Sequence, residues 1–549
     1  MKAEYLNMQG DRGARVYLSR GAWSWRLLGL LGLAGLALGS GMRALAWGAT
    51  TIDGLSPAAT STSAAPPLAP LVFDGVTVVD VEQGRLLPDQ RVVIVGTRIK
   101  HMGGASTVRV PAGARVVDAR GKYLIPGLWD LHAHPNQFPS HDPNSSLRWH
   151  HDIAIVHPLL IANGVTGIRD AGSTVPLDTL KLWRRQILAG TRVGPPRQIL
   201  SGHALDEETP CRRGYGKWAG GHTCVIDEDD ARHVVDSLKK DGADMLKMYN
   251  LSTWMYFVIA AEARKIGIPF GGHINNKMAK ITAIEASDSG ASILDHVNAA
   301  GDLDELCLGK DASVDRCQPV AEHFRRNNTW WVPTLIVEAS LVFGTPENMR
   351  VGRLRVGRPL GPASLAILRR FYQFVDAFWA GSELHLTGLR EAASGAQPPQ
   401  PAASDAGNTL HIVHSVGLPI LAGTDFFLGK DELARQPPGF CLHAELALYV
   451  AEGLTPLEAL QTATLNPAKL LHATDSLGTV APGKLADLVL LDADPLQDIA
   501  NTTAIRGVVA NGRYFDRAAL DQLLADVRTT AKQPAPPRGP PQQPPPLGP

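Results

Sequence analysis

The chain has 549 residues, of which 44% are hydrophobic and 19% charged, a balance that allows a globular protein to bury a large core. Its 53 basic and 53 acidic residues cancel, so charge gives no case for nucleic acid as a partner. Five cysteines are too few for a fold built on disulfides.

The N-terminal segment has the pattern of an export signal. Basic residues precede an apolar run at residues 27–39, which is short and rich in glycine, and Ala44-Leu45-Ala46 offers small residues for cleavage. We predict a signal peptide at residues 1–46, with an uncleaved N-terminal anchor as the alternative, and a flexible leader at 47–69. The expected location is therefore outside the cytoplasm, periplasmic or secreted.

Short segments with strand-like alternation stand near both ends of the remaining chain. They occupy residues 71–80 and 91–95 on one side, and 483–492 and 505–513 on the other. The sequence between them has a different pattern of apolar and polar residues.

Eight apolar runs alternate with helical patterns through residues 122–476, as repeated β-α units of a parallel sheet do. This rhythm predicts an α/β fold, a (β/α)8 TIM barrel, in which functional residues collect at the carboxyl ends of the strands. The runs are residues 124–129, 165–170, 197–203, 244–249, 268–273, 291–296, 331–337 and 418–425.

Polar residues at the ends of these runs form a candidate metal-ligand set. One residue separates His132 from His134, so both imidazoles point to the same face of an extended strand and one metal ion could contact both. The other members follow later strands and converge with the first two if the barrel forms. The complete set is His132, His134, Lys247, His273, His296 and Asp425.

The motifs around these residues resemble the metal-ligand strands of the amidohydrolase superfamily, and in particular its imidazolonepropionase-like and Xaa-Pro dipeptidase-like hydrolases. The resemblance spans residues 70–516. It implies that residues 70–121 and 477–516 pair into one small β-sandwich beside a barrel at 122–476. The motifs are Pro-Gly-Leu-Trp-Asp-Leu-His-Ala-His at 126–134, Leu-Lys-Met-Tyr at 246–249, Gly-Gly-His at 271–273, Leu-Asp-His at 294–296 and Ala-Gly-Thr-Asp at 422–425.

The same resemblance implies a site for two divalent metal ions, with zinc the favoured metal. Burial beside cations favours the neutral form of a lysine, which can add carbon dioxide to give an anionic carbamate ligand. Asp425 would accept a proton from the attacking water and pass it to the leaving amine. The implied ligands are His132, His134 and Asp425 for one ion, His273 and His296 for the other, and the Lys247 carbamate bridging both.

The predicted reaction is hydrolysis of a carbon–nitrogen amide bond in a small molecule such as a dipeptide or an N-acyl amino acid. A mononuclear ring deaminase or a cyclic-amide hydrolase of the same superfamily is the alternative. The related deaminases lack the lysine and place a glutamate soon after the histidine that matches His273, where this chain has Ile274-Asn275-Asn276. A metal-free barrel that serves as an assembly module is an alternative of another class, and a homo-oligomer is left open.

Further polar residues are candidates for substrate contacts. Tyr249 shares a strand face with the candidate bridging lysine and resembles a tyrosine that relatives use on a substrate carbonyl or carboxylate; a half-buried barrel tyrosine is the alternative. His203 and His222 resemble substrate-facing histidines of that branch. Arg212 and Arg213 could pair with a substrate carboxylate, or could simply be solvated.

Cysteine spacing and two proline-rich stretches complete the predictions. Cys211 with Cys224, and Cys307 with Cys317, are local pairs of the kind that form disulfides in exported proteins, which leaves Cys441 free. Residues 343–409 look inserted, with a helical middle near 365–379. A helix is predicted at 517–531, and the proline-rich tail at 532–549 has no predicted catalytic part.

Overall fold

The computed structural model describes residues 68–136, 146–207, 218–219, 222–274, 279–309, 311–338, 360–381, 410–426 and 436–533, all within one compact unit that spans residues 50–549. The predicted signal segment, the leader up to residue 67, Cys211, the two loop arginines and the proline-rich tail from residue 534 lie outside the described residues. Among the helices described, none combines the length and the apolar composition needed to cross a membrane.

Strands from both ends of the described chain share one eight-stranded sheet, in the order β18-β17-β16-β5-β1-β2-β3 with β4 beside β1. The junction is antiparallel, with Leu490 opposite Leu124. The predicted pairing of segments before and after the central region is therefore confirmed, whereas the two-layer sandwich stays a prediction. The strands are β1 (Leu71–Asp80), β2 (Arg85–Val95), β3 (Arg98–Gly104), β4 (Arg115–Asp118), β5 (Tyr123–Pro126), β16 (Leu488–Leu491), β17 (Ile505–Ala510) and β18 (Arg513–Asp516).

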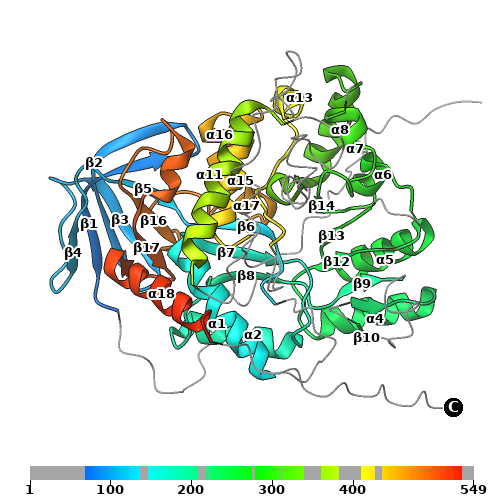
Figure 1. Cartoon of the computed structure of the whole chain (residues 1–549), viewed down its shortest axis with the longest axis horizontal. Coiled ribbons are helices and arrows are strands. Elements are labelled where there is room, and N and C mark those ends of the chain that lie inside the picture. Colours follow the sequence, from blue (N-terminus) through cyan, green and yellow to red (C-terminus); the bar gives the residue numbers. More distant parts are fainter. Residues whose placement is uncertain are drawn as a thin grey trace, which may run out of the picture. The chain divides into compact units, whose positions relative to one another are not determined.

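The central region contains two further sheets whose strands run mainly parallel. One has the order β6-β7-β8 and the other the order β10-β11-β9-β12-β13-β14-β15, in which only β10 and β11 are antiparallel. Figure 1 shows α4, α5, α6 and α8 beside the strands of the second sheet. The strands are β6 (Leu128–Ala133), β7 (Val165–Asp170), β8 (Arg197–Leu200), β9 (Ala204–Asp206), β10 (Trp218–Ala219), β11 (His222–Cys224), β12 (Leu246–Met248), β13 (Phe270–Gly272), β14 (Ile293–Asp295) and β15 (Trp330–Val332).

Hydrogen bonds and isolated bridges connect these two sheets to each other. The Asp244 amide donates to the Leu200 carbonyl at 2.8 Å, which links β8 to the segment before β12. Parallel bridges join Trp331 to Ile420 and Ala133 to Phe426, so the segment 418–426 lies between β15 and β6. One apolar cluster joins side chains of β6, β8, β14 and β15 to Met245 and Leu421; its strand residues include Trp129, Leu131, Ile199, Ile293, Trp330 and Val332.

Helices follow most of the parallel strands, and several begin at capping residues that the sequence supplies. Asp227 accepts a hydrogen bond from the Asp230 amide at the start of α4, and Thr282 with Glu285 forms a capping box at α6. The helices are α1 (Ser146–Ala162), α2 (Leu177–Ala189), α4 (Glu228–Lys240), α5 (Thr253–Ile266), α6 (Ala283–Asp288), α7 (Leu303–Cys307), α8 (Val314–Asn327), α11 (Pro362–Trp379), α13 (His411–Val416), α15 (Phe440–Ala451), α16 (Pro456–Thr462), α17 (Leu465–Leu470) and α18 (Arg517–Thr530), with the 3-10 helix η1 (Ile499–Thr503).

The predicted first strand, residues 124–129, is divided between two sheets. β5 pairs with β16, whereas β6 pairs with β7. The partner changes at Gly127, whose amide donates to the Asp487 carbonyl, and a Cβ there would lie 2.1 Å from Thr166 Oγ1. The apolar run is continuous in sequence, so hydrophobicity alone could not locate this change.

Of the other predicted strands of the central region, only 165–170 is observed with its predicted bounds; β12, β13 and β14 each span three residues within the runs 244–249, 268–273 and 291–296. The run 331–337 stays extended only through Val332, because Thr334 has a φ of 52° and residues 335–338 are helical. The run 197–203 ends as a strand at Leu200, and 418–425 forms bridges rather than a full strand. The predicted Cys307–Cys317 disulfide is present, and Cys441 is a free, buried thiol. Cys224 is also disulfide-bonded.

Candidate metal centre

The predicted ligands stand at or just beyond the carboxyl ends of parallel strands. His132 lies in β6, and Lys247 is the central residue of β12. His273 follows β13, and His296 follows β14. The strand register holds neighbouring ends level, since Lys247 is opposite Gly271 and Gly272 is opposite Leu294.

Glycines allow the strands that carry the ligands to approach one another. Gly272 has a φ of 140°, and a Cβ there would lie 2.0 Å from the Met248 carbonyl oxygen. A Cβ at Gly423 would lie 2.4 Å from Val332 Cγ1 and 2.7 Å from the His132 amide nitrogen. Any larger residue at either position would therefore displace a strand that carries a candidate ligand.

Two candidate ligands occupy the left-handed backbone region. His296 has a φ of 66° and Asp425 a φ of 54°. This conformation costs roughly 1–3 kcal/mol for a residue other than glycine, and it is concentrated at functional sites. It also breaks the strict side-to-side alternation of an extended strand.

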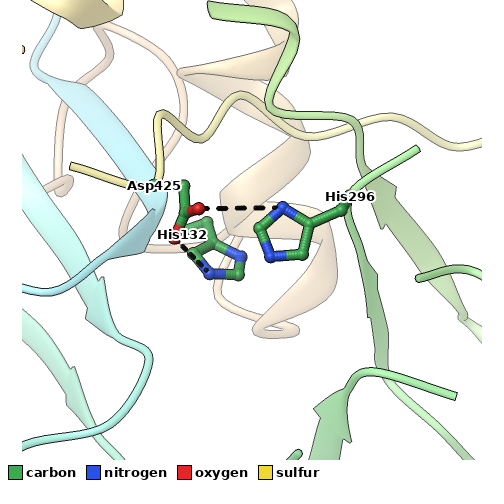
Figure 2. Close-up of side chains that lie close together, drawn as sticks. All are labelled: His132, His296 and Asp425. Atoms are coloured by element: carbon green, nitrogen blue, oxygen red, sulfur yellow. Dashed lines mark ion pairs between the residues drawn. The ribbon is translucent and has the colours of Figure 1, made fainter. Parts of the chain in front are cut away.

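Asp425 lies among three imidazoles. Its Oδ1 atom is 3.2 Å from His132 Nε2 and 3.1 Å from His134 Nε2, and its Oδ2 atom is 3.9 Å from His296 Nδ1. The ligand atoms of His132, His296 and Asp425 all lie within 4.8 Å of one another. Figure 2 shows these three side chains close together. This cluster brings together residues from three strand ends that are far apart in sequence.

A second group of rings continues from this cluster. His296 lies 4.8 Å from His273 between ring centroids, and His273 lies 4.4 Å from Tyr249. Tyr249 is in turn 4.7 Å from His222, whose Nδ1 atom is 3.1 Å from Asp206 Oδ2. The structure thus places Tyr249 and His222 beside the candidate ligands.

His203 belongs to the same neighbourhood. Burial lowers its pKa to about 4, and the charge of His222 lowers it further in the same direction. His203 is therefore a neutral ring at pH 7. Arg212 and Arg213 lie outside the described residues, so their predicted contact with a carboxylate stays a prediction.

The protonation states suit metal binding. Burial lowers the pKa of His134 to about 4 and that of His296 to about 3, so both rings are neutral at pH 7. Burial also lowers the pKa of Lys247, against the opposing charge of Asp295. Burial alone would raise the pKa of Asp425, but the nearby His296 and His132 hold it well below its usual range. Deprotonated nitrogen and oxygen donors are what a divalent cation requires.

One buried donor atom supports the fit of a metal at this position. His273 Nε2 makes no hydrogen bond to any described residue, although it is buried. Buried polar atoms without partners are rare and point to a missing ion or water. Imidazole and carboxylate donors match the preferences of zinc and of several other first-row divalent metals. The residues present therefore fit a divalent metal centre.

Two residues of this centre were not among the predicted site residues. Asp295, at the end of β14, has both carboxylate oxygens in contact with site residues: Oδ1 is 2.9 Å from His132 Nδ1, and Oδ2 is 2.5 Å from Lys247 Nζ. Arg169, in β7, donates to both oxygens at 2.8 and 3.3 Å. The Leu-Asp-His motif contained Asp295, but only its histidine was recognised as functional.

Known proteins give an independent view of this arrangement. Residues 396–514 match the amidohydrolase family. This segment is therefore similar to the amidohydrolase family. An imidazolonepropionase of Pyrobaculum arsenaticum is 47% identical over 79 residues, which is 14% of this chain and 17% of the relative. An adenine deaminase of Rubrobacter xylanophilus is 41% identical over 64 residues, which is 12% of this chain and 11% of the relative. Each match therefore spans less than a fifth of the relative's length.

Solved structures extend the likeness over most of the chain. A candidate prolidase from Bifidobacterium longum superposes with a TM-score of 0.57 at 22% sequence identity, covering 84% of this chain and 100% of that one. At this identity the likeness shows a shared fold. The amidohydrolase relatives imply a (β/α)8 barrel, and the described residues of the central region form mainly parallel sheets with helices between strands.

Proposed function

We propose that this protein is a metal-dependent amidohydrolase that cleaves a carbon–nitrogen amide bond in a small molecule. The observation that carries the proposal is the convergence of six donor residues, five of them buried and His273 partly buried, at the ends of parallel segments, together with neutral imidazoles and a depressed lysine pKa.

The bridges at Ile420 and Phe426 and the Asp244–Leu200 hydrogen bond support a closed ring of eight parallel segments. We infer that this ring is the (β/α)8 barrel. The apolar cluster around Leu131 and Val332 would then fill its interior. The candidate ligands would lie at the carboxyl-end mouth, where such barrels bind their substrates.

Residues of the chain divide the proposed chemistry among them. His132, His134 and Asp425 are suited to hold one ion, His273 and His296 the other, and Lys247 to bridge both as a carbamate. When bound, divalent ions polarise a carbonyl and lower the pKa of water toward neutrality. Asp425, an ionised carboxylate among three imidazoles, would take the proton of the attacking water and deliver it to the leaving nitrogen.

A dipeptide or N-acyl amino acid with a free carboxylate is the substrate class that we favour. Tyr249 lies beside His273, and His222 lies beside Tyr249; both could offer hydrogen-bond donors to a carbonyl or an anion. The structural likeness to a candidate prolidase supports the same class. The adenine deaminase match favours ring deamination as the second candidate. The absence of a glutamate in Ile274-Asn275-Asn276, directly after His273, counts against that alternative.

The experiment that tests this proposal combines a substrate screen with one variant. Purified protein supplied with a divalent metal and bicarbonate should hydrolyse members of a dipeptide and N-acyl amino acid library. Lys247→Ala should abolish this activity, and short carboxylic acids should restore part of it, because they can occupy the place of the carbamate. Lys265→Ala, at a lysine whose side chain is 71% exposed, is the matched control and should keep full activity.

Two outcomes would overturn parts of the proposal. Full activity of Lys247→Ala without added acid would remove the bridging role of this lysine. Release of ammonia from adenine or another ring, with no cleavage of any amide in the library, would favour the deaminase.

A further inference from the structure

Asp295 contacts two candidate ligands at once, His132 and Lys247. Its Oδ1 atom contacts His132 Nδ1 and its Oδ2 atom contacts Lys247 Nζ, at 2.9 and 2.5 Å. The side chains of Asp295 and His132 have no exposed surface, and that of Lys247 is 1% exposed. Water therefore cannot replace either contact.

Arg169 fixes the position of the Asp295 carboxylate. Its guanidinium donates to both carboxylate oxygens and, through Nη1, to the Leu131 carbonyl at 3.2 Å. A planar guanidinium that holds both oxygens sets the plane of the carboxylate. Since Leu131 immediately precedes His132, the same guanidinium also ties β6 to β14.

The contact with Lys247 has a consequence for the carbamate. The neutral amine has two N–H bonds; when its nitrogen forms a bond to the carbon of carbon dioxide, one proton leaves to solvent and one N–H remains. That N–H stands on the atom that Asp295 Oδ2 already contacts. The Asp295 carboxylate can accept a hydrogen bond from this remaining N–H. Such a hydrogen bond would restrict rotation of the carbamate about its bond to the lysine side chain.

We propose that Asp295, held by Arg169, is a positioning residue that orients two ligands at once. Its Oδ1 atom, 2.9 Å from His132 Nδ1, is placed to take the hydrogen of that nitrogen and so to leave Nε2 for the metal, and its Oδ2 atom would accept the remaining N–H of carbamylated Lys247 and so orient the carbamate oxygens. This inference rests on the proposed metal centre. It adds a role for a residue pair that is not among the candidate metal ligands.

Another buried pair in the protein provides a matched comparison. Arg197 and Asp487 form an ion pair of 2.7 Å with side chains 2% and 5% exposed. Arg197 lies at the amino end of β8, whereas the candidate ligands lie at carboxyl ends. Removing the charge of Asp487 should therefore perturb a buried ion pair of the same kind without reaching any ligand.

The test compares Asp295→Asn with Asp487→Asn in the full chain. Zinc affinity is measured by competition with a chromophoric chelator, and the carbamate by the ¹³C NMR signal after addition of ¹³C-bicarbonate. Asp295→Asn should lower zinc affinity by roughly 10–100-fold, as loss of partners that orient metal ligands does elsewhere, and should weaken the carbamate signal. Asp487→Asn should change neither, although both variants lower the melting temperature.

Arg169→Lys keeps the positive charge and loses the two-oxygen contact, so it should give a smaller loss of zinc affinity. It also keeps the proposal testable if Asp295→Asn does not fold. Wild-type zinc affinity and carbamate signal in both folded site variants would overturn the positioning role. A wild-type protein that binds no zinc would instead overturn the proposed metal centre, so the two failures are distinguishable.

Discussion

Glu445 offers the most quantitative test of how the scaffold supports the site. This glutamate lies in α15 with no exposed surface, and it accepts hydrogen bonds from the Leu335 and Ile336 amides at 2.8 and 2.6 Å. These amides directly follow Thr334, whose Oγ1 atom is 2.7 Å from His296 Nδ1. Glu445 therefore holds the turn that orients His296.

Glu445→Ala leaves two buried N–H groups without an acceptor. Each such group costs about 1–3 kcal/mol, so the variant should lose about 2–6 kcal/mol of unfolding free energy. Glu445→Gln keeps one acceptor oxygen and should lose about half as much. Urea unfolding of chelator-treated protein measures these losses. Zinc affinity should fall as well, because His296 is then less firmly oriented.

Glu452→Gln is the control for this prediction. Glu452 caps the same helix and is also buried, but its hydrogen bond comes from Ser364 in α11, away from the site. It should lose stability and keep zinc affinity. Wild-type stability and zinc affinity in Glu445→Ala would refute the reasoning that leads from α15 to His296.

Three further predictions address the substrate, the pH dependence and export. Substrates with a free C-terminal carboxylate should have a kcat/KM at least about tenfold higher than their amidated counterparts, a difference of ~1.4 kcal/mol in transition-state binding. Tyr249→Phe should narrow this ratio of kcat/KM values. An unchanged ratio in Tyr249→Phe would exclude Tyr249 from carboxylate recognition. Burial raises the pKa of Asp170 from 3.8 to about 8, so the folded chain keeps a proton that the unfolded chain releases, and stability falls as pH rises between these values. The melting temperature of chelator-treated protein should therefore fall less between pH 4 and pH 8 in Asp170→Asn than in the wild type. An equal fall in both proteins would contradict the assignment of this pH dependence to Asp170. Mature protein from the natural host should begin near Trp47 outside the cytoplasm, and N-terminal sequencing that finds Met1 on cytoplasmic protein would contradict export.

The ligand residues could be proposed from sequence because each is marked by its own short motif. Gly-Gly-His shows this well: a Cβ at Gly272 would meet the Met248 carbonyl oxygen, so the geometry that delivers His273 requires the glycine that the sequence displays. Gly423, two residues before Asp425, is a similar local signal. Local steric requirements of this kind are visible without a structure.

Arg169 and Asp295 could not be paired from sequence because their relation is long-range. Arg169 precedes Asp170, and both close the same apolar run; deciding which one points toward Asp295 requires the strand register. His296 adds a second difficulty, since its left-handed backbone breaks the alternation used to assign faces. Glu445 was missed because its partners are backbone amides, which leave no pattern in the sequence.

The central claim is a centre for two divalent ions, and metal content per folded chain tests it most directly. Protein reconstituted with zinc and bicarbonate, freed of excess metal and measured by inductively coupled plasma mass spectrometry, should retain close to two ions per chain. His273→Ala should retain fewer, because it removes a ligand of one ion only. A folded wild-type chain that retains no divalent ion would contradict the account.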